Sequence, residues 1–198
     1  MTVIRLPGGG LFLHSPVKLD PDLKQALDAL GPVRAIVAPS KAHHLFAGDY
    51  IGAYPEAVFY AAPGVGDRRR DLVVGRILGD DPPPLWAGQI EQHLFRGVPA
   101  LNEVVFLHLA SRTLIVTDLV FNVPASEPHR ARLFYTLVGA VGRFGPHRVV
   151  RMAFRDKQAA RRSVAAILEW DFDRVVMSHG QVLETGGHDQ FRAAFTWL

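Results

Sequence analysis

The sequence contains no cysteine among its 198 residues. This absence excludes disulfide bonds, zinc sites built from thiolates, iron–sulfur clusters and cysteine nucleophiles. A metal ion in this protein would therefore need ligands from histidine, aspartate or glutamate. The sequence also lacks an apolar run of about 18 residues, the length that a membrane-spanning helix requires. Its first residues, MTVIRLPGGG, lack the basic start and apolar stretch of a secretory signal. We therefore expect a cytoplasmic protein with no membrane partner.

Lysine is scarce as well, because it supplies only four of the 22 basic residues and arginine supplies the others. The densest basic run, residues 68–70, is flanked by Asp67 and Asp71, which partly neutralise it. A nucleic-acid-binding protein would show a basic stripe with interleaved aromatic residues, and the sequence shows none, so we expect no nucleic-acid partner. The apolar fraction of 48% excludes a disordered chain. The length predicts a single domain over residues 1–198.

Apolar runs between turn residues alternate with helical patterns along the chain. We predict strands over Val3–Leu6, Leu11–His14, Val33–Ala38, Ala57–Ala61, Ile90–Phe95, Glu103–His108, Thr113–Thr117 and Arg174–Met177. We predict helices over Pro21–Leu30, Pro128–Val141, Asp156–Trp170 and Asp189–Leu198. Residues 64–88 are rich in Gly, Pro and charge and form the longest segment predicted to be irregular. Strands clustered twice and interleaved with helices indicate an α/β layered sandwich whose mid-chain strands are antiparallel.

Side chains able to bind a metal follow three of these strands directly. His43 and His44 follow Val33–Ala38, Asp118 follows Thr113–Thr117, and His179 follows Arg174–Met177. Functional groups collect at strand ends in α/β folds, so these side chains converge if the strands share one edge. Each has an ordinary alternative: a helix-capping Asp, a His bonded to backbone, and an adjacent His pair that arose by chance.

The segments PSKAHHLF, NEVVFLH, SRTLIVTDL and WDFDRVVMSHG carry a family resemblance. Their order and spacing resemble the metallo-β-lactamase superfamily, and within it a branch described only as a domain of unknown function. The resemblance covers essentially the whole chain. It implies a metallo-β-lactamase-like four-layer αββα sandwich with mixed sheets. It also implies a metal-dependent hydrolase whose small-molecule substrate is an ester, thioester, amide or phosphodiester.

The motif His-x-His-x-Asp-His of the superfamily falls on residues 39–44, with its final His on His44 and its Asp on His43. The metal-bridging Asp of the family matches Asp118, and the last His matches His179. The resemblance therefore implies that these four residues are ligands of one divalent metal. It also makes Asp118 a candidate base that orients a water molecule. Zn²⁺ is the first expectation, with Fe²⁺ or Mn²⁺ as alternatives, because imidazole with carboxylate accepts several divalent ions.

Three further histidines of the family have no counterpart in this chain. Two of them fall on Pro39 and Lys41, and the third lies close to Pro99. Since these positions build the first metal site in the family, the chain would hold at most one metal ion. An alternative is that the ammonium of Lys41 pairs with Asp118 in place of the ion. The protein would then bind no metal and would be a catalytically decayed fold that acts as a binding or scaffold protein.

Glu103 lies at the start of a predicted strand near the expected cleft. It is a candidate stand-in ligand, or an acceptor behind the ligands, and the alternative is a solvated or Arg-paired side chain. Leu107–Leu109 and Phe195–Leu198 are candidate contacts of a homodimer, with a core role as the alternative. A serine hydrolase is disfavoured because the sequence has no Gly-x-Ser-x-Gly segment.

Overall fold

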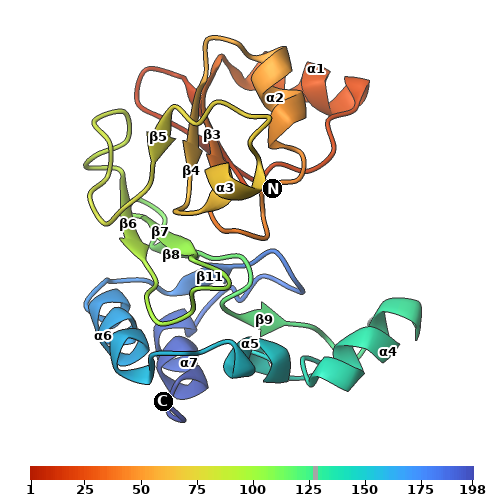
Figure 1. The fold of residues 1–198 in the computed structure, drawn as a ribbon, viewed down its shortest axis with the longest axis vertical. Helices are drawn as coiled ribbons and strands as arrows, with labels where there is room; N and C mark the ends of the chain where they lie inside the picture. Colours follow the sequence, from red (N-terminus) through yellow and green to blue (C-terminus); the bar gives the residue numbers. More distant parts are fainter. Residues whose placement is uncertain (127–128) are drawn as a thin grey trace.

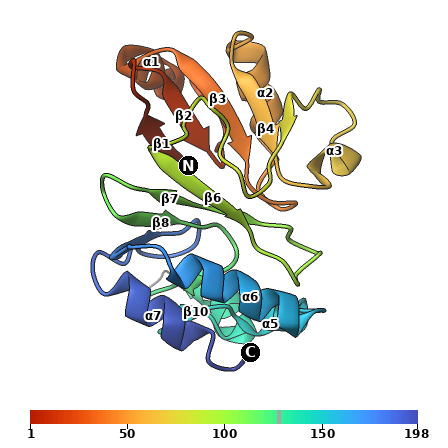
Figure 2. The same cartoon turned by 90° about the vertical axis from the view of Figure 1, so that its left-hand side faces the viewer.

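The computed structural model describes residues 1–126 and 129–198, and these residues form four layers: helices, sheet, sheet, helices (Figure 2). The first sheet, within the described residues, has the strand order β1-β2-β3-β4-β5. Its strands are β1 (Thr2–Arg5), β2 (Leu11–His14), β3 (Val33–Ala38), β4 (Val58–Ala61) and β5 (Arg76–Ile77). The second sheet has the order β11-β8-β7-β6. Its strands are β6 (Ile90–Leu94), β7 (Val104–His108), β8 (Thr113–Ile115) and β11 (Arg174–Val176).

Both sheets are mixed, as the resemblance predicts. β1 pairs antiparallel with β2, whereas β2, β3, β4 and β5 pair in parallel. In the second sheet β6, β7 and β8 are antiparallel, which confirms the prediction for the mid-chain strands. β11 then adds in parallel to β8. A short antiparallel pair, β9 (Phe121–Asn122) with β10 (Phe144–Gly145), was not predicted from the sequence.

Alternate side chains of β7 point to opposite faces of the second sheet and so belong to two separate parts of the core. Phe106 faces the first sheet, where its ring makes an edge contact with Phe12 at a centroid distance of 5.5 Å. Val105 and Leu107 face the opposite way, toward the core beneath the helices of the second sheet. Burying a side chain of this size is worth roughly 1.5–3 kcal/mol. Leu107 and Phe195, from the two candidate dimer segments, are both buried within the chain's own core.

Helices cover the outer faces of both sheets. α1 (Pro21–Leu30) has the predicted bounds, because the Asp20 side chain accepts from the Leu23 amide at 2.8 Å and Pro21 begins the helix. It lies over the first sheet with α2 (Ala47–Ala53). α6 (Lys157–Leu168) and α7 (Gly187–Ala194) cover the second sheet (Figure 2). None of the described helices is long and apolar enough to cross a lipid bilayer.

The helix predicted over Pro128–Val141 differs from the expectation. The structure has α4 (His129–Val138), which extends away from the body of the molecule, and Pro128 lies outside the described residues (Figure 1). Leu133 and Leu137 lie four residues apart, on one face of this helix, and they are 66% and 71% exposed, so this apolar face does not pack into the core. Periodicity shows that a helix has an apolar face, but it does not show what covers that face.

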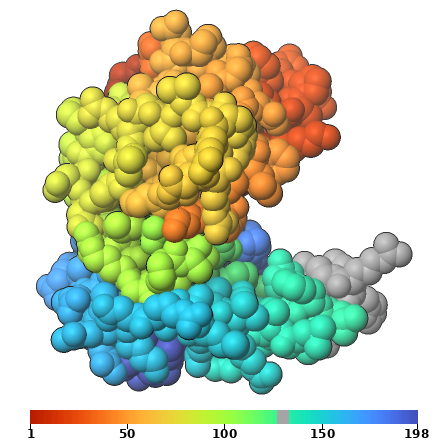
Figure 3. Space-filling view, in the orientation of Figure 1, coloured from red at the N-terminus to blue at the C-terminus, as the bar shows by residue number. Residues whose placement is uncertain are grey.

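The segment 64–88 is less irregular than predicted. It contains a helical turn, α3 (Val65–Arg68), and the edge strand β5, which pairs with β4. One further short helix, α5 (Arg148–Met152), begins after His147, whose ring accepts from the Val150 amide. On the surface, a notch separates the half built on the first sheet from the half built on the second (Figure 3).

Candidate metal centre

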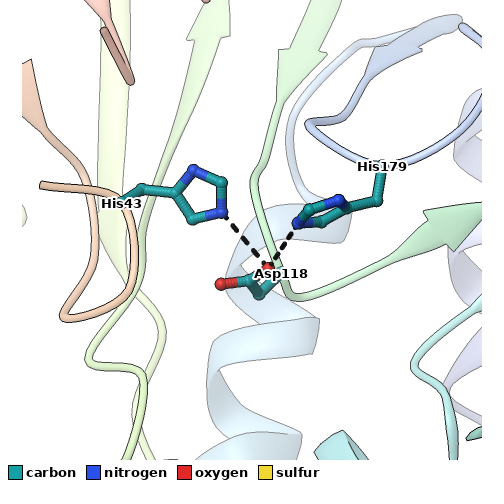
Figure 4. A group of neighbouring side chains, drawn as sticks. All are labelled: His43, Asp118 and His179. Carbon is teal, nitrogen blue, oxygen red and sulfur yellow. Dashed lines mark ion pairs between the residues drawn. The ribbon is translucent and has the colours of Figure 1, made fainter. Parts of the chain in front are cut away.

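Three of the residues singled out in the sequence meet at one point (Figure 4). His43 lies in the loop between β3 and α2, Asp118 follows β8, and His179 follows β11. β8 and β11 are parallel neighbours, so their carboxyl ends lie at the same edge of the second sheet. The three side chains offer ligand atoms that lie within 4.8 Å of one another.

Both imidazoles contact the same oxygen of Asp118. Its Oδ1 lies 3.2 Å from Nε2 of His43 and 3.0 Å from Nε2 of His179. Burial alone would raise the pKa of the Asp118 carboxyl, but the hydrogen bonds from His179 and His43 outweigh it and hold the pKa below its usual range. Asp118 is therefore ionised across the neutral range and presents a negative charge to the cleft.

The donor set fits one divalent ion. Two ligands each about 2.1 Å from an ion lie roughly 3.0–3.4 Å apart, and Oδ1 of Asp118 lies 3.2 and 3.0 Å from the ring nitrogens of His43 and His179. Two imidazoles and one carboxylate are the ligands of many catalytic zinc sites and of non-haem iron sites. These three residues could together hold one metal ion.

His44 lies beside this group and is not part of it. It lines the same cleft, but the cluster of possible ligands in the described residues contains His43 in its place. Both residues follow a turn in which the Ser40 hydroxyl accepts from the amides of Ala42 and His43. The pKa of His44 is lowered, first by burial and then by the charge of Arg69.

Lys41 has a different partner from the one considered above. Its ammonium donates to the carbonyl oxygen of Pro99 at 3.0 Å, and no ion pair with Asp118 occurs among the described residues. The family resemblance places one lost histidine of the first metal site on Lys41 and another close to Pro99. In this chain they contact each other.

Glu103 lies directly behind Asp118. Its side chain is 1% exposed, and its two carboxylate oxygens accept from the amides of Thr117 and Asp118 at 2.6 and 2.9 Å. Burial and the nearby charge of Asp118 raise the pKa of Glu103 to about 7, against the opposing effect of these hydrogen bonds. Of the two roles predicted for Glu103, the geometry matches the acceptor behind the ligands.

Sequence reasoning missed the residues that orient the two histidines. The Ser15 hydroxyl lies 2.7 Å from Nδ1 of His43. The ring of His179 stacks on Phe121 at a centroid distance of 4.9 Å with an interplanar angle of 6°. The only sequence signal for Ser15 is that it follows β2, the strand parallel to β3, and Phe121 follows Asp118 by three residues.

The three-residue group opens into a cleft of about 620 Å³. This volume lies in the range of small-molecule sites. Apolar side chains line much of the cleft, with Leu45 and Phe46 from the segment before α2 and Met177 and Val182 around His179. His14, Ser15 and Ser178 add polar groups. The arrangement is a mostly apolar cleft with a histidine–carboxylate group on its wall.

Solved structures confirm the resemblance at the level of the fold. A metallo-β-lactamase from Pontibacter korlensis matches with a TM-score of 0.63 and 12% identity, covering 98% of this chain and 85% of the other. The metallo-β-lactamase FIM-1 from Pseudomonas aeruginosa, in a mono-zinc form, matches with a TM-score of 0.62 and 14% identity over 98% and 80%. The Flv1 flavodiiron core from Synechocystis matches at 0.61 and 13% over 95% and 49%.

Sequence comparison gives a family without an assigned activity. No curated protein matches the chain. One family model matches residues 1–139, a span that includes His43 and Asp118 and ends before His179. The chain therefore belongs to the family described as a domain of unknown function, DUF4336.

Proposed function

We propose that this protein is a one-metal hydrolase of a small molecule carrying an ester, thioester, amide or phosphodiester bond. His43, Asp118 and His179 would hold the ion, and the observation that carries the proposal is their convergence within 4.8 Å on the wall of a cleft. A bound divalent ion would lower the pKa of a water molecule toward neutrality and polarise the scissile group.

The charges around the group favour a cation. Glu103 and Asp118 are two carboxylates in one buried region, and the charge of Asp118 is a cause of the raised pKa of Glu103. The mutual repulsion of buried like charges falls when a dication lies beside them. Zn²⁺ is the first choice, since FIM-1 shares the fold and occurs in a mono-zinc form, and Fe²⁺ or Mn²⁺ suit the same donors.

Side chains of the cleft would then exclude bulk water and orient the attacking water molecule. The apolar wall formed by Leu45, Phe46 and Met177 would exclude bulk water from the substrate. Both histidines contact Oδ1 of Asp118, and Oδ2 would be able to accept a hydrogen bond from a water molecule and orient it. Asp118 would thus serve as a ligand and would orient the water molecule.

The experiment is a metal analysis of protein purified without chelator, followed by titration with Zn²⁺, Mn²⁺ and Fe²⁺. We expect one ion per chain, lost in His43→Ala and His179→Ala. His188→Ala is the matched control, because His188 bonds the carbonyl of Leu168 outside this cleft. A wild-type protein that stays far below one equivalent after added metal would contradict the proposal.

The second candidate is a metal-free binding or scaffold protein. The contact between Lys41 and Pro99 favours it, because the resemblance places one lost ligand of the first site on Lys41 and another close to Pro99. In that case His43→Ala and Asp118→Asn would leave ligand binding unchanged, and a chelator would change neither stability nor binding.

A further inference from the structure

We propose that Ser15 is a positioning residue for His43, whose hydroxyl holds the imidazole with Nε2 toward Asp118 in either neutral tautomer. This inference rests on the proposed metal site. Ser15 directly follows β2, whereas His43 lies in the loop after β3.

Ser15 is well placed to fix the ring. Its side chain is buried, with the residue 7% exposed, and its amide donates to the carbonyl of Val37 in β3 at 2.9 Å. Its Oγ lies 2.7 Å from Nδ1 of His43, while Nε2 of the same ring lies 3.2 Å from Oδ1 of Asp118. The imidazole is therefore held at both nitrogens between the two halves of the molecule.

A hydroxyl is suited to both states of this histidine. In a neutral ring whose Nε2–H donates to Asp118, Nδ1 accepts, and the Ser15 hydroxyl donates to it. A ligand of a metal ion must present the lone pair of Nε2, so the single ring proton is then on Nδ1 and donates to the same oxygen of Ser15. Because a serine hydroxyl is both donor and acceptor, the ring keeps its orientation when the proton position changes by exchange with water.

The backbone of Ser15 supports a functional reason for this residue. Its φ is 54°, in the left-handed region that disfavours residues with a Cβ atom. Glycine would adopt this conformation without strain. Strained backbone conformations that persist tend to cluster at functional sites, and here the strained residue supplies the hydroxyl that touches His43.

The test separates the hydroxyl from the backbone by two substitutions. Ser15→Ala removes the hydroxyl and keeps the strain, whereas Ser15→Gly removes both. We expect each variant to bind Zn²⁺ about 10–100-fold more weakly than the wild type, the usual effect of losing a hydrogen-bond partner of a metal-ligating histidine. We also expect the metal-free Gly variant to melt at a higher temperature than the Ala variant. The Gly variant would then be more stable than the Ala variant without binding Zn²⁺ more tightly.

Ser111→Ala is the matched control, because Ser111 makes a contact of the same length, 2.7 Å, with Nδ1 of His108 outside the cleft. It should bind Zn²⁺ like the wild type. A Gly variant that binds Zn²⁺ with wild-type affinity would overturn the proposal, since Ser15 would then matter only through its backbone.

A second readout does not need the metal. In ¹⁵N spectra of the metal-free protein, His43 is assigned by comparison with His43→Ala, and its Nδ1 resonance should shift in Ser15→Gly. An unshifted resonance would overturn the role of Ser15. If the wild type binds no Zn²⁺ at all, the proposed function fails, and this spectrum alone decides the role of Ser15.

Discussion

Glu103 should make the free energy of unfolding depend on pH, and one substitution should remove this dependence. The side chain is buried, and its pKa is raised from 4.5 to about 7 in the folded protein. A carboxyl group that binds its proton more tightly when folded stabilises the protein below the unfolded pKa, and this stability is lost as the pH rises toward 7. The contribution of Glu103 to the free energy of unfolding should therefore fall by about 2.5 kcal/mol between pH 5 and pH 8, at about 1.36 kcal/mol per pKa unit.

The substitution is Glu103→Gln, and the assay is urea unfolding in the presence of a chelator at pH 5, 6, 7 and 8. The Gln amide places an NH₂ group against one of the two backbone donors of Thr117 and Asp118, so the variant is less stable at pH 5. Its deficit should shrink as the pH rises, because it carries no charge to bury. Other buried groups titrate in this range, so only the difference between the two proteins is informative. A difference that is constant from pH 5 to pH 8 would refute the reasoning.

Three further predictions test the surroundings of the site. Gly180→Ala should destabilise the protein by about 2 kcal/mol or more and weaken Zn²⁺ binding, since Gly180 has φ 104° and a Cβ atom there would overlap the carbonyl of Asn122; unchanged urea unfolding would contradict this. His14→Leu should make the protein less sensitive to acid. Burial lowers the pKa of His14 from 6.5 to about 3, so keeping the ring neutral in the folded protein costs stability as the pH falls below 6.5, by about 3 kcal/mol at pH 4. Equal slopes of the unfolding free energy against pH in the wild type and the variant would count against this. Lys41→Met should leave the Zn²⁺ affinity within about twofold, because the Lys41 ammonium bonds Pro99 and surface contacts of this kind are weak; a large loss in calorimetric titration would point to a direct role.

The sequence predicted those elements whose ends carry local signals. α1 and β3 have the predicted bounds, because Asp20 and Pro21 begin the helix and Gly31 and Pro32 separate it from the strand. The meeting of Asp118 and His179 also followed from a local rule, because they come just after the parallel neighbours β8 and β11. His43 reaches them from the other sheet, after β3, and the same rule does not cover it.

The sequence could not predict what depends on contacts between distant segments. The sequence predicted both His43 and His44 as ligands, but in the described residues only His43 belongs to the group with Asp118 and His179. The hydrogen bond between Ser15 and His43 joins residues 28 positions apart, and the hydrogen bonds of Glu103 cross to the strand end 14 and 15 positions later. The exposure of the apolar side chains of α4 likewise depends on whether another part of the chain packs against them.

The candidate metal centre lies on the seam between the two sheets, with His43 supplied by the first half and Asp118 and His179 by the second. An ion there would bind residues from both halves of the sandwich at once. Its binding free energy, about 4 kcal/mol at a free concentration a thousand times Kd, would then stabilise the join between the halves rather than a single loop. Chelation would therefore lower the melting temperature of the entire chain.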